Sequence, residues 1–191
     1  MRIIAGTYRS RILKSLKGQA LRPTSDRLRE TLFNVLGPAV NQSRFVDVFA
    51  GTGAVGIEAL SRGAAEVVFI EKHGPAAALI RRNLEQLQIR SGATVLPVDA
   101  VSGLERLAAK HESGDSPFNF LFIDPPYALA EQYDRVLRFL GSAPYVTDGS
   151  VVIAEHSRRQ DFADRFGTLA RTRILRQGDA ALTFYRAIGP P

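Results

Sequence analysis

The stretch that decides the fold is residues 45–56, which read FVDVFAGTGAVG. An apolar, β-rich run leads directly into the pattern G-x-G-x-x-G, which is typical of the turn from a first strand into a helix in nucleotide-binding α/β folds. Glycine is needed in such a turn because the backbone bends sharply and a ligand must approach it without meeting a Cβ atom. We therefore expect a strand at 45–50, a glycine-rich loop and a helix from residue 54.

The rest of the chain repeats this strand-to-helix alternation. Strands are predicted at 67–71, 94–97, 118–124 and 150–155, and helices at 54–62, 75–89, 101–111 and 129–140. The chain closes with two strands, 172–176 and 181–187, that are joined without a helix. These patterns predict an α/β, Rossmann-like fold: a mostly parallel, doubly wound, seven-stranded sheet that ends in an antiparallel hairpin.

The first residues have a different character. Residues 1–29 hold eight basic residues and one acidic residue, a net charge of +7 against +6 for the whole chain. Apolar runs around residues 3 and 12 predict a small hairpin, and residues 26–36 predict an amphipathic helix. We expect a basic, RNA-binding extension at 1–24 and a larger α/β domain at 25–191. Clustered Lys and Arg supply the sequence-independent part of nucleic-acid affinity, although a solvated basic face has the same composition.

Composition narrows the class of protein. With 191 residues, the chain is long enough for one substantial core. It has no Cys, and its three His residues are scattered, so we expect no metal. No apolar stretch approaches the roughly 18 residues of a membrane span, and the N-terminus lacks the apolar core of a signal peptide. We therefore expect a cytoplasmic protein that does not bind membranes.

Three acidic residues lie within, at the end of or just after the first three predicted strands. Asp47 lies four residues before Gly51, where a carboxylate would meet the ammonium of S-adenosylmethionine but would repel the pyrophosphate of a dinucleotide. Glu71 ends the second strand, where it can accept hydrogen bonds from ribose hydroxyls. Asp99 can receive an adenine amino group or cap the following helix, and the sequence leaves both roles open.

The predicted strand at 118–124 ends in the strongest chemical signal of the sequence, Asp124-Pro125-Pro126-Tyr127. The prolines remove two backbone donors and stiffen the turn, so an acceptor carboxylate, carbonyl oxygens and an aromatic ring meet at the end of a buried strand. Two acceptors can hold both hydrogens of an exocyclic amine and orient its lone pair, and Tyr127 can stack on the unpaired base. Asp124 can also take the proton afterwards, and the sequence does not separate this role from positioning.

Together these motifs resemble the RsmD-like methyltransferases, a family that modifies a guanine N2 of bacterial small-subunit ribosomal RNA. The resemblance runs nearly end to end and is most specific at 22–34, at 47–53 and at the acidic turn. It implies a class I methyltransferase fold for the domain at 25–191. It also implies S-adenosylmethionine as methyl donor, S-adenosylhomocysteine as product, and 16S rRNA in the small subunit as substrate. The implied cofactor residues are Asp47, Phe49, Ala50, Gly51, Thr52, Gly53, Glu71, Lys72, Asp99, Ala100 and Asp124.

The basic segment departs from the family at residues 8–11, where Tyr-Arg-Ser-Arg replaces the expected Trp-Arg-Gly-Arg. A serine at a glycine position puts the hairpin turn and its RNA contact in question, and it leaves the cofactor and amine sites unaffected. The RNA-contact candidates are Arg9, Arg11, Arg22, Arg27 and Arg29. An arginine on a capped helix also pairs locally with acidic neighbours.

Other functions share parts of this pattern. The nearest alternative is methylation of a DNA adenine or cytosine amine, but the sheet consumes the chain after about residue 44 and leaves no room for a separate recognition domain. A catalytically inactive RNA-binding protein has no physical need for Asp47, Glu71, Asp99 and Asp124 together. A nicotinamide dehydrogenase is disfavoured by Asp47 and by the terminal hairpin. We expect a monomer.

Overall fold

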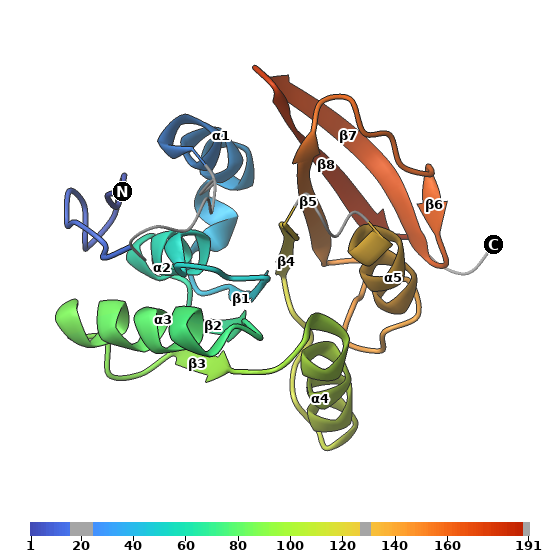
Figure 1. Cartoon of the computed structure of the whole chain (residues 1–191). Coiled ribbons are helices and arrows are strands. Elements are labelled where there is room, and N and C mark those ends of the chain that lie inside the picture. The colour runs from blue at the N-terminus through green and yellow to red at the C-terminus, as the bar shows by residue number, and fades with distance from the viewer. Residues whose placement is uncertain (16–24, 127–130, 189–191) are drawn as a thin grey trace. The chain divides into compact units, whose positions relative to one another are not determined.

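The computed structural model describes residues 1–15, 25–126 and 131–188. Its contacts divide the chain into two compact units, Met1–Asp99 and Ala100–Pro191 (Figure 1). The described N-terminal residues belong to the first unit, and the predicted boundary at residue 24 stays a prediction. Whether residues 1–24 act as a separate RNA-binding extension stays a prediction.

The first unit is a three-stranded parallel sheet with helices. Its elements are α1 (Asp26–Leu36), the 3-10 helix η1 (Gly37–Val40), β1 (Arg44–Val48), α2 (Ala54–Ser61), β2 (Glu66–Ile70), α3 (Gly74–Gln86) and β3 (Ala93–Leu96). The strands lie in the order β3-β2-β1, with Val48 opposite Ile70 and Ile70 opposite Leu96. Helix α2 packs on β1 and β2, and α3 packs on β3 (Figure 1). The carboxyl ends of the three strands are therefore level with one another.

Helix α1 has the bounds that the sequence predicts. The Ser25 hydroxyl accepts a hydrogen bond from the Leu28 N–H at 3.1 Å and caps the helix. One face of the helix buries Leu28, Leu32, Phe33 and Leu36. Gly37 follows with a φ of +57°, so the helix ends there.

The second unit contains α4 (Ala100–Glu112), β4 (Phe120–Ile123), α5 (Glu131–Leu140), β5 (Val151–Ser157), β6 (Arg165–Phe166), β7 (Leu169–Gln177) and β8 (Ala180–Ala187). Its strands lie in the order β4-β5-β8-β7-β6; β4 and β5 are parallel, and the other neighbours are antiparallel. The predicted closing hairpin is thus confirmed as β7 and β8. The two-residue strand β6 was not predicted, so the described residues form eight strands instead of seven.

The cores of both units are apolar, as β1, β2, β4 and most of β5 are buried along their length. Continuous burial agrees with strands that are covered on both faces. No helix of the described residues has the length and hydropathy of a membrane span.

Candidate active site

The glycine-rich loop after β1 has an unusual backbone. Phe49, Gly51 and Gly53 have φ values of +66°, +55° and +78°. A left-handed φ is costly for a phenylalanine, and such strain is concentrated at functional sites. A Cβ atom added to Gly51 would have one neighbour within 4 Å, the Phe49 carbonyl oxygen at 3.9 Å. The loop therefore leaves space for a ligand at Gly51.

Asp47 and Gly56 hold this loop against the start of α2. The Asp47 carboxylate is only 2% exposed, and its Oδ2 accepts a hydrogen bond from the Gly56 N–H at 2.9 Å. A Cβ atom on Gly56 would lie 2.3 Å from the Phe69 ring and 2.8 Å from Val67. The third glycine of the motif therefore serves close packing of helix on strand, and Asp47 places a buried carboxylate beside Gly56.

Glu71 connects the carboxyl end of β2 to the same loop. Its Oε2 accepts from the Gly51 N–H at 2.8 Å, and its Oε1 accepts from the His73 N–H at 2.8 Å. The side chain is half-buried. An ionised carboxylate has about four lone-pair sites, so Glu71 keeps acceptor capacity for ligand hydroxyls. The predicted ribose acceptor and the predicted glycine loop are thus in direct contact.

The remaining cofactor candidates follow β1, β2 and β3 along the chain, and Ala100 begins the second unit. Ala50 follows β1 and donates its N–H to the Ile70 carbonyl at 3.0 Å. Lys72 is exposed next to Glu71. Asp99 is exposed directly before α4, and Ala100 is the first, buried residue of that helix. Both predicted roles of Asp99, the helix cap and the adenine acceptor, stay predictions.

The acceptor turn follows β4 in the second unit. Asp124 is half-buried, Pro125 is buried and Pro126 is exposed, and the four residues of the strand before them are all buried. Ile123 lies opposite Ala154 in the parallel pair of β4 and β5. Asp124 therefore lies at a carboxyl edge of parallel strands, where ligands bind in open α/β sheets. Tyr127 lies outside the described residues.

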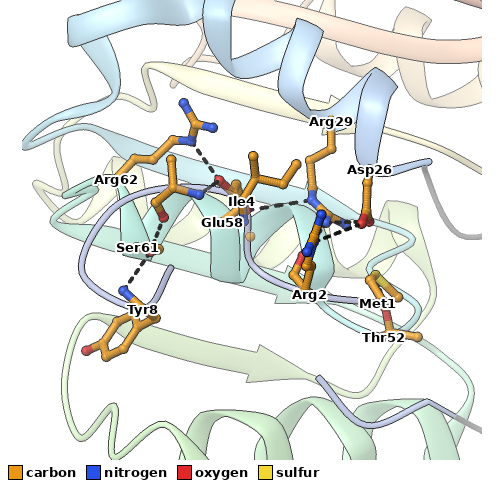
Figure 2. Close-up of polar contacts among 12 residues, drawn as sticks. Met1, Arg2, Ile4, Tyr8, Asp26, Arg29, Thr52, Glu58, Ser61 and Arg62 are labelled. Carbon is orange, nitrogen blue, oxygen red and sulfur yellow. Dashed lines mark hydrogen bonds and ion pairs between the residues drawn. The ribbon is translucent and has the colours of Figure 1, made fainter. Parts of the chain in front are cut away.

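Glu58 on α2 anchors the N-terminal segment, defined here as residues 1–14 (Figure 2). Its side chain is fully buried and accepts from the N–H groups of Ile4 and Ala5 at 2.8 and 3.0 Å. Arg62 donates to it at 2.8 Å, and Arg29 Nε lies 3.7 Å away. The segment closes on itself as a short hairpin, with one antiparallel bridge between Arg2 and Ile12. The predicted hairpin is confirmed, although it forms no extended strands.

Asn83 on α3 connects the segment to the glycine loop. It is fully buried; its Oδ1 accepts from the Lys14 N–H at 2.9 Å, and its Nδ2 donates to the Lys14 and Thr52 carbonyls, each at 3.2 Å. The Thr52 hydroxyl also lies 3.9 Å from the Met1 sulfur (Figure 2). Sequence reasoning missed Glu58 and Asn83, because their backbone partners in the N-terminal segment lie 53 to 69 residues away in the chain.

The structure corrects one RNA-contact candidate. Arg29 is fully buried, donates to the Arg2 carbonyl at 2.6 Å and pairs with Asp26 at 2.9 Å. A guanidinium in this position cannot reach an RNA phosphate, so Arg29 supports the fold. Arg9, Arg11 and Arg27 are exposed, as an RNA contact requires, and Arg22 lies outside the described residues.

His156 on β5 has a structural environment. Its Nε2 lies 2.7 Å from the Thr183 hydroxyl, its Nδ1 lies 2.8 Å from the Ser157 carbonyl, and its ring packs edge-on against Phe162. Burial lowers the pKa of His156 below its ordinary value, so the neutral ring is favoured. Both ring nitrogens have polar partners within the protein, so His156 supports the packing of β5 beside β8. Within the described ranges, no group of three or more His, Cys, Asp or Glu side chains is placed to hold a metal ion.

Related proteins match nearly the whole chain. The family model described as "Conserved hypothetical protein 95" matches residues 1–186. YlbH from Bacillus subtilis is 34% identical over 189 residues, 99% of this chain and all of that protein. Ribosomal RNA small subunit methyltransferase D from Escherichia coli K12 is 40% identical over 155 residues, 81% of this chain and 74% of that protein.

Solved structures give the same answer for the fold. The structure of yhhF from Escherichia coli is 29% identical, covers 98% of this chain and 97% of its own, and superposes with a TM-score of 0.83. SMU.776, solved in complex with SAH, is 13% identical, with a TM-score of 0.64 over 84% of this chain and 48% of its own. The fold is therefore the predicted Rossmann-like class I methyltransferase fold, and the chain belongs to the Conserved hypothetical protein 95 family of RsmD-like rRNA methyltransferases.

Proposed function

We propose that this chain transfers a methyl group from S-adenosylmethionine to the exocyclic N2 of a guanine in 16S rRNA of the bacterial small ribosomal subunit. The observation that carries the proposal is the acceptor turn, Asp124 and Pro125 directly after the buried strand β4, in a member of an rRNA methyltransferase family. We also propose that the chain acts as a monomer in the cytoplasm.

The residues at the edge of β1 to β3 fit S-adenosylmethionine by their chemistry. Glu71 offers carboxylate lone pairs to ribose hydroxyls, and Asp99 offers an acceptor to the adenine amino group. An ionised Asp47 carboxylate would attract the cationic methionine part. Space at Gly51 lets a ligand approach the backbone. The binding of SAH by SMU.776 supports this choice of cofactor on the same fold.

The acceptor turn performs the second half of the reaction. The Asp124 carboxylate and the Pro125 carbonyl would accept the two hydrogens of the guanine amine and orient its lone pair. S-adenosylmethionine supplies a methyl group made electrophilic by the sulfonium sulfur. On transfer of that methyl group to the nitrogen, S-adenosylhomocysteine would be the product, and the amine would lose one proton to Asp124 or to water. Tyr127 would stack on the base after it leaves its helix.

The test is transfer of a labelled methyl group to undermodified small subunits and to naked 16S rRNA. We expect the wild-type chain to label at least one substrate, and Asp124→Ala to lose at least ~100-fold in kcat, as enzymes do when an electrostatic contact to the reacting centre is removed. Asp124→Asn is the matched variant, since it keeps the shape and one acceptor oxygen. Activity of Asp124→Asn well above that of Asp124→Ala assigns a positioning role, and equal loss assigns a role to the charge.

Cofactor binding provides the independent control. SAH should raise the melting temperature of wild-type chain and of Asp124→Ala alike, because a ligand bound by the folded state alone stabilises it. Stabilisation by SAH without transfer to either RNA would reject the RNA substrate. No stabilisation would reject the cofactor assignment.

A further inference from the structure

The second unit carries a group of arginines at the same sheet edge as the acceptor turn. Strand β5 runs parallel to β4 and continues past the level of Asp124, since Ile123 lies opposite Ala154 and β5 ends at Ser157. Arg158 and Arg159 follow directly. On the antiparallel hairpin, Ala180 lies opposite Ser157, and Ala181 lies opposite Arg176. The carboxyl ends of β4, β5 and β7 therefore share one edge.

Backbone contacts fix this arrangement. The Arg158 N–H donates to the Asp179 carbonyl at 2.8 Å, which ties the turn after β5 to the turn between β7 and β8. A residue advances a strand by about 3.3 Å, and neighbouring strands lie about 4.8 Å apart. Arg158 is thus within roughly 10 to 15 Å of Asp124, a reach of one or two nucleotides.

The three arginines keep their charge available. Arg158, Arg159 and Arg176 are exposed, and no described carboxylate lies within ion-pair distance of them. Two acidic residues of the loop before β6, Asp161 and Asp164, pair instead with Arg171, the first at 3.1 Å. Guanidinium groups bind phosphate oxygens through two parallel hydrogen bonds, which suits them to a nucleic-acid backbone.

We propose that Arg158, Arg159 and Arg176 form an RNA-backbone site that holds the phosphates flanking the nucleotide presented to Asp124. This inference rests on the proposed methylation of RNA. A base that leaves its stack costs a few kcal/mol of unstacking. Phosphate contacts beside the target nucleotide offset that cost and fix the register of the strand without reading its sequence.

The test compares two triple variants. The first replaces Arg158, Arg159 and Arg176 by Gln. The control replaces Arg90, Arg106 and Arg135, which are likewise exposed and without an ion pair to a described residue, so that the net charge changes equally. The affinity of each chain for naked 16S rRNA is measured by filter binding at several salt concentrations. SAH affinity is measured by calorimetry, and kcat and KM are measured for methyl transfer.

We expect the first variant to bind RNA at least tenfold more weakly than the control at ~150 mM salt, with a slope of log K against log salt that is smaller by about 2, as loss of three single-strand phosphate contacts predicts. KM for RNA should rise, while SAH affinity and kcat at saturating RNA stay unchanged. Equal RNA affinity and equal slope in the two variants would overturn the site. Wild-type chain that binds RNA without methylating it would contradict the proposed function. The comparison of the RNA affinities of the two triple variants would still test whether the three arginines contact RNA.

Discussion

Glu71 and Glu58 both accept two backbone N–H groups, yet the structure around each carboxylate differs. Glu58 is fully buried and faces Arg29 and Arg62, so its charge is neutralised within the protein. Glu71 is half-buried and pairs with no Lys or Arg of the described residues. A neutralised, buried carboxylate serves as an anchor for the chain, whereas a carboxylate that keeps its charge at a loop can serve a ligand.

The largest effect on stability is expected at the anchor. Glu58→Ala removes the fully buried carboxylate that faces Arg29 and leaves Asp26, which is more exposed, as a partner of that buried arginine. Removing one member of a buried ion pair costs about 3–5 kcal/mol. The free energy of unfolding, from urea denaturation, measures the loss. The matched control is Glu66→Ala, which removes the partner of Arg44 in a half-exposed pair and should cost less than ~1 kcal/mol. Equal losses would contradict the assignment of Glu58 as an anchor.

Glu71→Gln should weaken the binding of SAH and leave the free energy of unfolding nearly unchanged, in contrast to Glu58→Ala. Gln keeps an acceptor for the Gly51 N–H but loses the charge, and a hydrogen bond to a charged group contributes about 1.5–3 kcal/mol. We expect a tenfold to hundredfold weaker affinity for SAH by calorimetry, with little change in unfolding free energy. Unchanged affinity would remove Glu71 from the cofactor site and leave it a loop-supporting residue.

Two glycines of the G-x-G-x-x-G motif should differ in the same way, one in stability and the other in SAH affinity. Gly56→Ala places a Cβ atom 2.3 Å from the Phe69 ring, and overpacking of this kind costs about 1–3 kcal/mol in unfolding free energy. Gly51→Ala meets no close neighbour and adds only the strain of a φ of +55°. Melting temperature should fall more for Gly56→Ala, and SAH affinity should fall more for Gly51→Ala. The reverse order would show that Gly51 is the packing glycine.

The smallest expected effect is a gain in stability from a substitution in the N-terminal segment. Ser10 has a φ of +67°, a conformation that glycine adopts readily, and it donates its N–H to the Ile3 carbonyl at 2.9 Å. Ser10→Gly should relieve this strain and raise the unfolding free energy by up to ~1 kcal/mol, since left-handed strain in other residues costs of order 1–3 kcal/mol and glycine loses more entropy on folding. A loss of stability would show that the Ser10 side chain supports the hairpin.

The sequence predicts the parts of the structure that depend on local patterns. Helix α1 follows from its Ser25 cap and the spacing of its apolar residues, and the glycine loop follows from its motif. Glu71 could be placed because parallel strands bring their carboxyl ends together. These features need only local preferences and the rules of sheet topology.

The missing parts depend on contacts between distant residues. Nothing in the spacing around Glu58 indicates that it accepts from Ile4 and Ala5, and Asn83 on α3 has no local signal for its bonds to Lys14 and Thr52. The same reason accounts for Arg29, whose charge suggested a surface role. Its burial depends on Glu58 and on the Arg2 carbonyl.

The central claim is that the acceptor turn holds a guanine amine, and the identity of the methylated nucleoside tests it most directly. Undermodified small subunits and naked 16S rRNA are incubated with the chain and labelled S-adenosylmethionine. The RNA is then digested to nucleosides, which are separated by chromatography and identified by mass spectrometry. We predict label in N2-methylguanosine, and none when Asp124→Ala replaces the wild-type chain. Label in N6-methyladenosine or N4-methylcytidine, or N2-methylguanosine formed equally by Asp124→Ala, would contradict the account.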